Sequence, residues 1–241
     1  MSVAPADQAL YEIVSSAAPV TIDDVLHTMQ SIDQLLPGTD GLKWFNRLYM
    51  MVTQQVDEQP PAGGWHDPVW LTRLDVVFAS FYFQAIAGFL SDSASTPSAW
   101  DALFEARYRT GIDRIQFAMA GMNAHINHDL ALALLETDAL LNVIPDLNSP
   151  QHAYYEAVNG LLKAVMPAAL QVLATGILGE LAQDTGKIGR ILAFWDICRA
   201  RDLAWAFADH LRGLDGVARA VALESQDQIT GALGRAILLS A

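Results

Sequence analysis

The chain has few charged residues and almost no cysteine. Lys, Arg, Asp and Glu together make up 17% of its 241 residues, against about 25% in a typical soluble domain. Basic residues are the scarcer kind, with 14 Lys and Arg against 27 Asp and Glu, so the formal net charge is −13. A body this acidic repels phosphate backbones and anionic membrane surfaces, so we expect neither a nucleic acid nor a membrane as a partner. Cys198 is the single cysteine, which excludes an intrachain disulfide and a zinc site built from thiolates.

Long hydrophobic runs and a leader segment are also missing. The longest uncharged runs, Val76–Ser91 and Ala164–Gly179, have 16 residues each, fewer than the roughly 18–20 that cross a bilayer. The start, MSVAPADQALYEIV, lacks the basic region and apolar run of a signal peptide. We therefore expect a cytoplasmic protein. The sequence also contains no GxSxG, GxGxxG or GxxxxGK[ST] motif, so it shows no sign of a serine-hydrolase elbow, a dinucleotide site or a P-loop.

What the chain does have is apolar residues, 52% of the total, at helical spacing. Leu42, Phe45, Tyr49 and Val52 repeat at three and four residues, and no segment alternates with period two for long enough to predict a strand. The length fits one large domain or two small ones, and we expect a single all-α domain, 1–241, forming a bundle of about nine to ten helices. The expected helices are 6–18, 21–36, 41–58, 68–90, 97–109, 112–142, 150–173, 175–184, 187–212 and 216–239.

Capping signals support these boundaries. Thr21 stands three residues before Asp24, the spacing of a capping box. Three further pairs place a good N-cap residue before a proline at the first helical position, namely Asp67-Pro68, Thr96-Pro97 and Ser149-Pro150.

One helix is expected at the centre of the bundle and contains an unusual polar segment. GMNAHINHDL, Gly121–Leu130, is flanked by apolar residues on both sides, and a helix without a wet face belongs in the interior. Helical spacing predicts that His125, His128 and Asp129 share one face. Asn123 and Asn127 would share another face, so the helix sends polar groups to two neighbours.

Three interpretations of this segment remain open. The side chains could form a fully hydrogen-bonded structural network, since burying them otherwise costs about 1–3 kcal/mol each. They could perform acid–base catalysis, with His125 as the acid or base and Asp129 orienting its imidazole. They could instead hold a divalent metal ion through His125, His128 and Asp129, with other helices supplying further ligands.

Residues on other helices are candidates for the same site. Asp75 and Tyr82 are seven residues apart and therefore on one helix face. Trp195 and Arg199 are four apart on a later helix, and with Asp75 and Tyr82 they are predicted to bind substrate. Arg199 and Arg201 could equally form surface ion pairs, and Cys198 beside them could be either a reactive thiol or a small core residue. We expect the apolar pocket wall to contain Phe78, Phe81, Met119, Met122 and Trp195.

The sequence resembles a family of all-helical bacterial proteins, common in actinobacteria, that is defined as a domain of unknown function. The resemblance covers most of the chain and is carried by Ile32-Asp33, Gly41–Tyr49, Leu74–Ala79, Tyr82, Trp100–Glu105, Tyr154–Asn159, Arg201–Trp205 and, most specifically, GMNAHINHDL. It implies a helical fold and brings no activity or catalytic residue with it. Members of such families occur beside biosynthetic genes, which by analogy favours small-molecule chemistry.

Together these observations predict an enzyme that uses no cofactor and performs acid–base chemistry on a small, mostly apolar metabolite. The reaction would be of the isomerase, lyase or cyclase type, with His125, Asp129 and His128 catalytic and Asn123 and Asn127 holding a substrate oxygen. The alternatives are a metal-dependent hydrolase or oxidase and a non-catalytic protein that binds a hydrophobic ligand. The high apolar fraction also predicts a homodimer.

Overall fold

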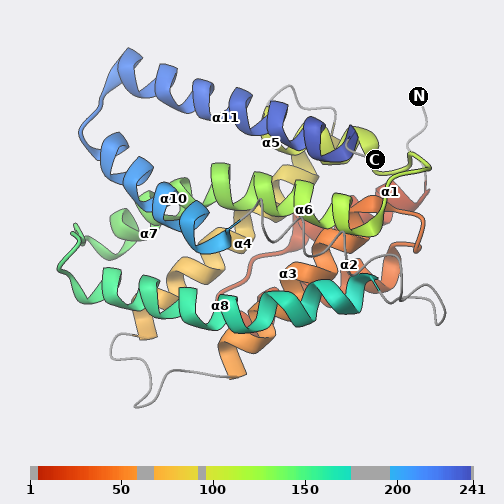
Figure 1. Ribbon diagram of the computed structural model, residues 1–241, viewed down its shortest axis with the longest axis horizontal. Coiled ribbons are helices and arrows are strands. Elements are labelled where there is room, and N and C mark those ends of the chain that lie inside the picture. Colours follow the sequence, from red (N-terminus) through yellow and green to blue (C-terminus); the bar gives the residue numbers. More distant parts are fainter. Residues whose placement is uncertain (1–4, 59–67, 92–95, 175–195, 240–241) are drawn as a thin grey trace.

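The structure is a computed structural model that describes residues 5–58, 68–91, 96–174 and 196–239. These residues are helical and include no strand, which confirms the all-α prediction. The helices, labelled as in Figure 1, are α1 (Pro5–Ser16), α2 (Ile22–Leu35), α3 (Gly41–Glu58), α4 (Pro68–Leu90), α5 (Ser98–Ala106), α6 (Arg114–Ala124), the π-helical turn η1 (His125–Asp129), α7 (Leu130–Leu141), α8 (Pro150–Ala174), α10 (Ile197–Arg212) and α11 (Gly216–Leu239). The helix expected at 175–184 and the first part of the one expected at 187–212 lie outside the described residues.

The predicted caps explain where several helices begin. At the start of α2, the Thr21 hydroxyl accepts a hydrogen bond from the Asp24 backbone N–H at 3.2 Å, and the Asp24 carboxylate accepts one from the Thr21 N–H at 2.9 Å. The Ser149 hydroxyl accepts from the backbone N–H of His152 at the start of α8. The capping box and the Ser149 cap are therefore confirmed, whereas Asp67 lies outside the described residues.

The start of α5 differs from the prediction. The helix begins at Ser98, one residue later than expected, and the residue before it, Pro97, has no side-chain oxygen with which to cap it. The Asp227 carboxylate of α11 caps the helix instead, accepting from the N–H groups of Ser98 at 2.9 Å and Ala99 at 2.8 Å. A residue far away in the sequence thus replaces the local cap that Thr96 was expected to supply, and it ties α11 to α5.

The polar segment lies in the central rod of the molecule. In Figure 1, α6, η1 and α7 follow one another between α11 on one side and α8 on the other. Helix α6 packs against α3, α5, α8 and α11, while η1 contacts α4, α10 and α11. The expected uninterrupted helix over 112–142 is therefore wrong in one respect: it is two α-helices within 114–141 joined by a π-turn at His125–Asp129.

Two glycines let α3 and α6 approach each other closely. A Cβ atom on Gly41 of α3 would lie 2.3 Å from the Phe117 ring of α6, and a Cβ atom on Gly121 of α6 would lie 2.3 Å from the Phe45 ring of α3. Real Cβ atoms do not approach carbon this closely, so each glycine makes room for a phenylalanine of the other helix.

This glycine–phenylalanine packing places the polar segment against α3. The two contacts advance by four residues on both helices, so the helices run in the same direction with one common register. One further turn along both helices brings Tyr49 of α3 against His125, with ring centroids 4.4 Å apart. The position of His125 therefore depends on small residues one and two turns earlier.

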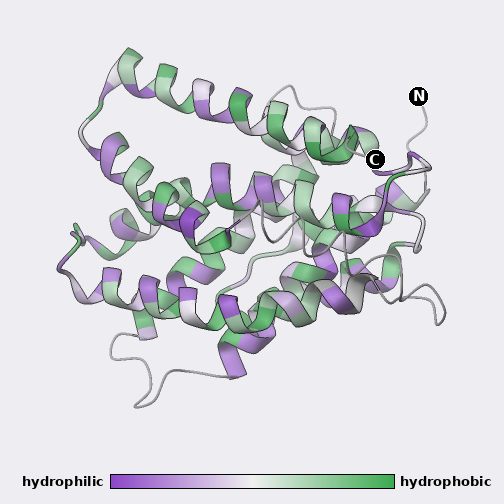
Figure 2. Ribbon diagram, in the orientation of Figure 1, coloured by the Kyte–Doolittle hydropathy of each residue, from purple (hydrophilic) through white to green (hydrophobic). Residues whose placement is uncertain are grey.

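The apolar side chains of the described helices pack into one contiguous core. Hydrophobic residues occur on most turns of the central rod and of α4 in Figure 2. Among the described residues, α4 is the one helix long and apolar enough to cross a membrane, and 44% of its most apolar window is buried inside the protein. In this fold α4 packs against η1 and α7, and its apolar side chains are accounted for by these contacts.

Candidate functional site

The π-turn η1 groups the polar side chains at the centre of the rod. Its closing hydrogen bond runs from the Leu130 backbone N–H to the His125 carbonyl, five residues back. Such single π-turns inside α-helices are frequent at functional sites, because they displace side chains from the regular helical positions. Within this turn, His125 and Asp129 are fully buried and His128 is mostly buried.

Asp129 accepts hydrogen bonds from three aromatic N–H groups. Its Oδ2 lies 3.0 Å from Nδ1 of His125 and 3.0 Å from Nε1 of Trp100, and its Oδ1 lies 2.8 Å from Nδ1 of His128. Burial alone would raise the pKa of this carboxyl, but the hydrogen bonds and charges of the two histidines outweigh burial and lower it. Asp129 is therefore an ionised carboxylate that receives an N–H from each neighbour.

The ionised carboxylate decides the tautomer of His125. Since Asp129 can only accept, Nδ1 of His125 must carry the proton and donate it, which leaves Nε2 as the basic nitrogen. Burial lowers the pKa of His125, and the opposing hydrogen bond and charge of Asp129 do not reverse that shift. The imidazole is therefore neutral near pH 7, with an available lone pair on Nε2.

Aromatic rings surround the His125 imidazole. The Phe78 ring stacks on it with centroids 3.5 Å apart and planes 7° apart, and Tyr49 contacts it edge-on from α3. Among the described residues, Nε2 of His125 is one of three buried side-chain polar atoms without a hydrogen-bond partner. Leaving such an atom unpaired costs about 1–3 kcal/mol, so it calls for an explanation.

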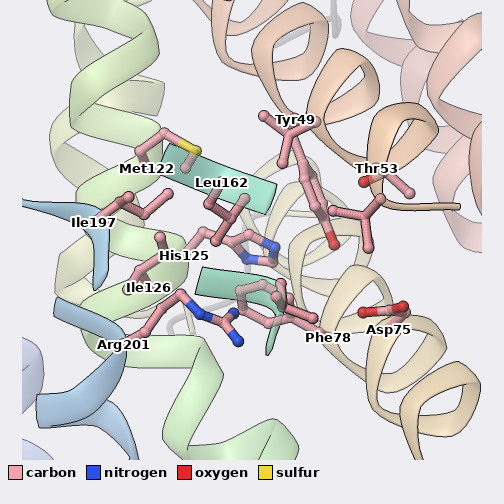
Figure 3. Close-up of a pocket in the computed structure, with 13 residues that line it drawn as sticks. Tyr49, Thr53, Asp75, Phe78, Met122, His125, Ile126, Leu162, Ile197 and Arg201 are labelled. Carbon is pink, nitrogen blue, oxygen red and sulfur yellow. The ribbon is translucent and has the colours of Figure 1, made fainter. Parts of the chain in front are cut away.

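A cavity of about 60 Å³ adjoins this imidazole. Figure 3 shows His125 between Tyr49 and Phe78, with Asp75 and Arg201 on opposite sides of the Phe78 ring. The lining comes from α3, α4, α6, η1, α8 and α10, and most of it is apolar: Val52, Val56, Phe78, Met122, Ile126, Val158, Leu162 and Ile197. Its polar members are Tyr49, Thr53, Asp75, His125 and Arg201.

Asp75 and Arg201 are the two charged side chains of the cavity. Asp75 of α4 is half-buried, and burial raises its pKa to about 7 although the charge of Arg201 acts in the opposite direction. Arg201 of α10 is 7% exposed and donates from Nε to Oδ1 of Asn159 at 2.7 Å and from Nη2 to the carbonyl of Tyr155 at 3.1 Å. The cavity thus combines an imidazole base, a carboxyl that titrates near neutrality and a fixed cation.

The asparagine face of the segment points away from this cavity, toward α11. Nδ2 of Asn123 donates to the Thr230 carbonyl at 2.9 Å, and its Oδ1 accepts from Nδ2 of Asn127 at 3.0 Å. Gln226 of α11 donates to the Asn127 carbonyl within the π-turn at 2.7 Å. These amides hold α11 onto the central rod, which is the bracing role that the structural interpretation assigned to them.

His128 belongs partly to each face. Its Nδ1 contacts Asp129, and its Nε2 lies 3.6 Å from Oδ1 of Asp227, the residue of α11 that caps α5. Burial lowers the pKa of His128, but the hydrogen bond to Asp129 and the charges of both carboxylates outweigh it, so the pKa is raised. His128 thus bridges two carboxylates, which favour its protonated form, and it does not line the cavity.

Other predicted residues lie outside the cavity. Tyr82 is fully buried, donates to Oδ1 of Asn46 at 3.3 Å and stacks on Trp100, so it supports the site from behind. The side chain of Arg199 is exposed, and Arg201 occupies the position expected of it. Phe78 and Met122 line the cavity as predicted, Phe81 and Met119 do not, and Trp195 lies outside the described residues.

The geometry gives little support to a metal or a reactive thiol. His125 and His128 both direct Nδ1 at Asp129 at hydrogen-bonding distance, and the part of the chain that the structure describes holds no group of three or more side chains arranged to bind a metal. Cys198 is buried and burial raises its pKa, so its thiol is protonated near neutrality and packs in the core.

Sequence reasoning did not identify Trp100, Tyr49 or Arg201 as parts of the site. Trp100 is the third donor to Asp129, and its position in an ordinary apolar stripe gave no sign of that role. Tyr49 could have been found from the repeated spacing of Gly41, Phe45 and Tyr49 on α3. That spacing matches Phe117 and Gly121 on α6 and His125 at the start of η1.

Comparison with known proteins gives one result. No curated protein and no solved structure matches the chain. The model of a family of unknown function, DUF5995, matches residues 22–240, which include every residue of the site described above. The chain therefore belongs to the family of unknown function DUF5995.

Proposed function

We propose that the protein is an enzyme that performs acid–base chemistry on a small, mostly apolar metabolite bound in the cavity beside His125. The reaction class is isomerisation, dehydration or cyclisation, and it needs no organic cofactor. Nε2 of His125 accepts or donates the proton, and Asp129 is a positioning residue that fixes the tautomer of the imidazole.

The unpaired Nε2 of His125 is the single observation that carries this proposal. A neutral imidazole whose other nitrogen is held by a carboxylate is the usual arrangement of a histidine general base. Here the Asp129 bond is 3.0 Å long, Nε2 is buried without a partner, and His125 lines a cavity. A purely structural histidine in a core would be expected to pair both nitrogens.

Asp75 also supports acid–base chemistry in this cavity. Most carboxyls are ionised at pH 7, but burial raises the pKa of Asp75 to about 7, so it can give up or take a proton near neutrality. It lines the same cavity as His125. Two groups with neutral-range protonation on one small cavity can move a proton from one substrate atom to another, as isomerisation and dehydration require.

The test is a search for proton transfer that depends on Nε2. Wild-type protein is incubated in D₂O with a library of short hydroxy, oxo and unsaturated acids, aldehydes and ketones, and NMR detects isomerisation, loss of water or deuterium bound to carbon. The key variant is His125→Asn, whose amide can still donate to Asp129 but which lacks Nε2. We expect it to lower the rate at least ~100-fold. His27→Asn, an exposed histidine on α2, is the matched control and should leave the rate unchanged.

The tautomer of His125 supplies a second readout that needs no substrate. In ¹⁵N NMR spectra at pH 7 we expect Nδ1 to be protonated and Nε2 unprotonated. The proposal fails if no compound is converted and the spectra show a proton on Nε2. Conversion that persists in His125→Asn would also overturn it. Tight binding of a hydrophobic compound without conversion would instead favour the non-catalytic binding protein.

Location, association and origin are also proposals. We propose a cytoplasmic bacterial protein in which GMNAHINHDL characterises the family.

We also propose a homodimer formed through α11. That helix buries only Thr230, Gly231, Gly234 and Leu238 among its described side chains, and hydrophobic residues recur along most of its length (Figure 2). Its exposed side chains include Val217, Val221 and Ile229. Light scattering should show twice the monomer mass of 26.2 kDa, and Ile229→Glu should return the monomer.

A further inference from the structure

Arg201 is a buried cation whose charge no described carboxylate neutralises directly. Its side chain is 7% exposed, and the groups that accept its hydrogen bonds, the Asn159 amide oxygen and the Tyr155 carbonyl, are both uncharged. Among the described residues it forms no ion pair. Buried arginines are normally paired with an anion, because an isolated buried charge is costly.

The guanidinium is also held in a fixed orientation. Besides its two hydrogen bonds to α8, its central carbon lies 4.0 Å from the centroid of the Tyr155 ring. The Tyr155 hydroxyl in turn donates to the Arg201 carbonyl at 2.6 Å. An arginine fixed in this way loses little conformational freedom when it binds an anion, which is a feature of binding sites rather than of surface ion pairs.

The other acid of the cavity does not complete this pair. Asp75 and Arg201 lie on opposite sides of the Phe78 ring in Figure 3. Arg201 acts on Asp75 through its charge and not through a hydrogen bond. Because its pKa is about 7, Asp75 is only partly ionised at neutral pH. The cavity therefore has a net positive side at Arg201, even though the protein as a whole carries a charge of −13.

The size and walls of the cavity limit the anion that can bind. Its volume is about 60 Å³, which is enough for more than a single water but only for a small ligand. Its remaining walls are apolar and include Phe78, Ile126 and Leu162. One arginine can bind a carboxylate through two parallel hydrogen bonds. Arg201 is the one arginine or lysine of the described lining, so the cavity offers no second cation to balance the additional charge of a phosphate.

We propose that this cavity binds a short aliphatic monocarboxylate, with the carboxylate on Arg201 and the hydrocarbon chain against Phe78, Ile126 and Leu162. The proposal rests on the proposed function in that it names the substrate class of the same site. Binding is nevertheless measured separately from proton transfer, so the two proposals can fail independently.

Butyrate and isobutyrate are the probes, and calorimetric titration and NMR shifts of cavity residues are the readouts. We expect millimolar or tighter binding that shifts the signals of His125 and Phe78. Butyramide has the same shape without the charge and should bind at least ~10-fold more weakly. Inorganic phosphate should not bind in the cavity. Equal binding of butyramide, or butyrate binding that leaves the cavity signals unchanged, would overturn the proposal.

A pair of arginine variants locates the anion. Arg201→Gln should weaken butyrate binding at least ~10-fold, whereas Arg199→Gln, on the same helix with an exposed side chain, should leave it unchanged. Equal weakening by both variants would show that the net charge of α10 matters and not this cavity, which would overturn the proposal. If Arg201→Gln does not fold, the comparison of butyrate with butyramide on the wild-type protein decides the question alone.

His125→Asn separates this proposal from the proposed function. Without Nε2 the cavity retains Arg201, so butyrate should still bind with an affinity within about threefold of wild type. Butyrate binding without any proton transfer in the wild-type protein would keep the ligand class and reject the enzyme. Proton transfer on uncharged compounds with no butyrate binding would keep the proposed enzyme and reject the carboxylate as its ligand.

The pH dependence gives a further check. Besides Arg201 on α10, the charged group that acts on Asp75 is Asp57 of α3, which shares its negative sign. Ionisation of Asp75 places a negative charge across the cavity from Arg201, so butyrate affinity should fall as the pH rises through about 7. Asp75→Asn should abolish this fall. A fall of the same size in Asp75→Asn would contradict the arrangement proposed here.

Discussion

The two faces of the polar segment Gly121–Leu130 solve the problem of buried polar groups in different ways. On the α11 face, the Asn123 side chain is fully buried and uses both its amide oxygen and its amide nitrogen in hydrogen bonds. On the cavity face, His125 is equally buried, yet one of its two nitrogens has no partner. Because the two side chains are equally buried and only two residues apart in the central rod, burial alone cannot account for the difference. The first face is organised for stability and the second retains an unsatisfied group beside an open space.

His125 and His128 also differ in their surroundings and in the direction of their pKa shifts. His125 lies among aromatic rings with one carboxylate beside it, and burial lowers its pKa. His128 retains some solvent exposure and lies between two carboxylates, Asp129 and Asp227, so its pKa is raised. One shared carboxylate therefore contacts an imidazole that burial keeps neutral and a second imidazole whose protonated form is favoured. This difference suits the first to proton transfer and the second to bridging helices.

The largest expected effect comes from Asp129→Asn, which disrupts both faces together. An asparagine amide has one acceptor oxygen and would point its own N–H groups at donors, so at least one of the three aromatic N–H groups would lose its partner. We expect a loss of about 3 kcal/mol or more, or about 6–12 °C in melting temperature. Asp23→Asn, at an exposed carboxylate of α2, is the control and should cost under about 0.5 kcal/mol. A mild effect of Asp129→Asn would show that the two faces are not joined through this carboxylate.

Asn123→Ala is the next largest change and removes the stabilising face alone. It leaves the Thr230 carbonyl and the Asn127 amide without their partners in a buried setting, which should cost about 2 kcal/mol. Chemical denaturation gives the loss in the free energy of unfolding. Butyrate binding in the cavity should be unchanged at a temperature where the variant is folded. Loss of cavity binding with stability retained would reverse the roles that we assign to the two faces.

His125→Asn should have a smaller effect on stability and a larger one on chemistry. The amide can keep the hydrogen bond to Asp129, and the lost nitrogen had no partner, so we expect a cost of about 1 kcal/mol. His125→Asn and His125→Ala both lose the ring that stacks on Phe78. His125→Ala should cost more, because it also leaves Asp129 with one donor fewer. Thermal melts of both variants beside the D₂O assay test this order. If His125→Asn is as destabilising as Asn123→Ala, the unpaired nitrogen must have a partner in solution.

The smallest expected effect concerns the pH dependence of stability. The pKa of His128 is raised in the folded state, so its stabilising contribution is present below the unfolded pKa of about 6.5 and is lost as the pH rises through the folded value. The pKa of His125 is lowered in the folded state, so His125 has the opposite effect. The free energy of unfolding falls as the pH falls below about 6.5, because the unfolded chain then binds a proton that the buried imidazole resists. The difference in unfolding free energy between wild type and His128→Gln should therefore shrink between pH 6 and pH 9. A constant difference would show that His128 is not a charged bridge.

Sequence spacing predicted that Asn123 would share a face with Asn127 and His125 with Asp129, because residues four apart remain neighbours even across a π-turn. It did not predict that His128 also points toward Asp227 of α11. The same spacing predicted a continuous helix, since nothing in HINHD itself marks the π-turn; the Asn127 carbonyl is satisfied by Gln226, almost a hundred residues later. The choice of Arg199 over Arg201 failed for a related reason. Which face of α10 turns inward is decided by its packing on α7 and η1 and by Asn159 and Tyr155 of α8, and none of these contacts is local.

Tyr82 and Asp75 show what a helical face can and cannot predict. They do lie on one face of α4, but the cavity is short and ends near Phe78, so the residue nearly two turns further along packs against Trp100 and Asn46. Spacing predicts toward which side of the helix a side chain points. The extent of a cavity depends on the side chains of other helices that close it. The capping box at Thr21 was predictable in full, because all of its atoms lie within four residues.

The glycine–phenylalanine packing of α3 against α6 has a consequence for how sequences of this family can diverge. Because Gly41 fits Phe117 and Gly121 fits Phe45, neither member of a pair can change size alone. We expect related sequences to vary these positions jointly, with a larger residue at one position accompanied by a smaller ring or aliphatic side chain at its partner. The same constraint offers an engineering route: Gly121→Ala combined with Phe45→Leu should be tolerated better than Gly121→Ala by itself, and would move the imidazole of His125 relative to α3 without altering any residue of the cavity.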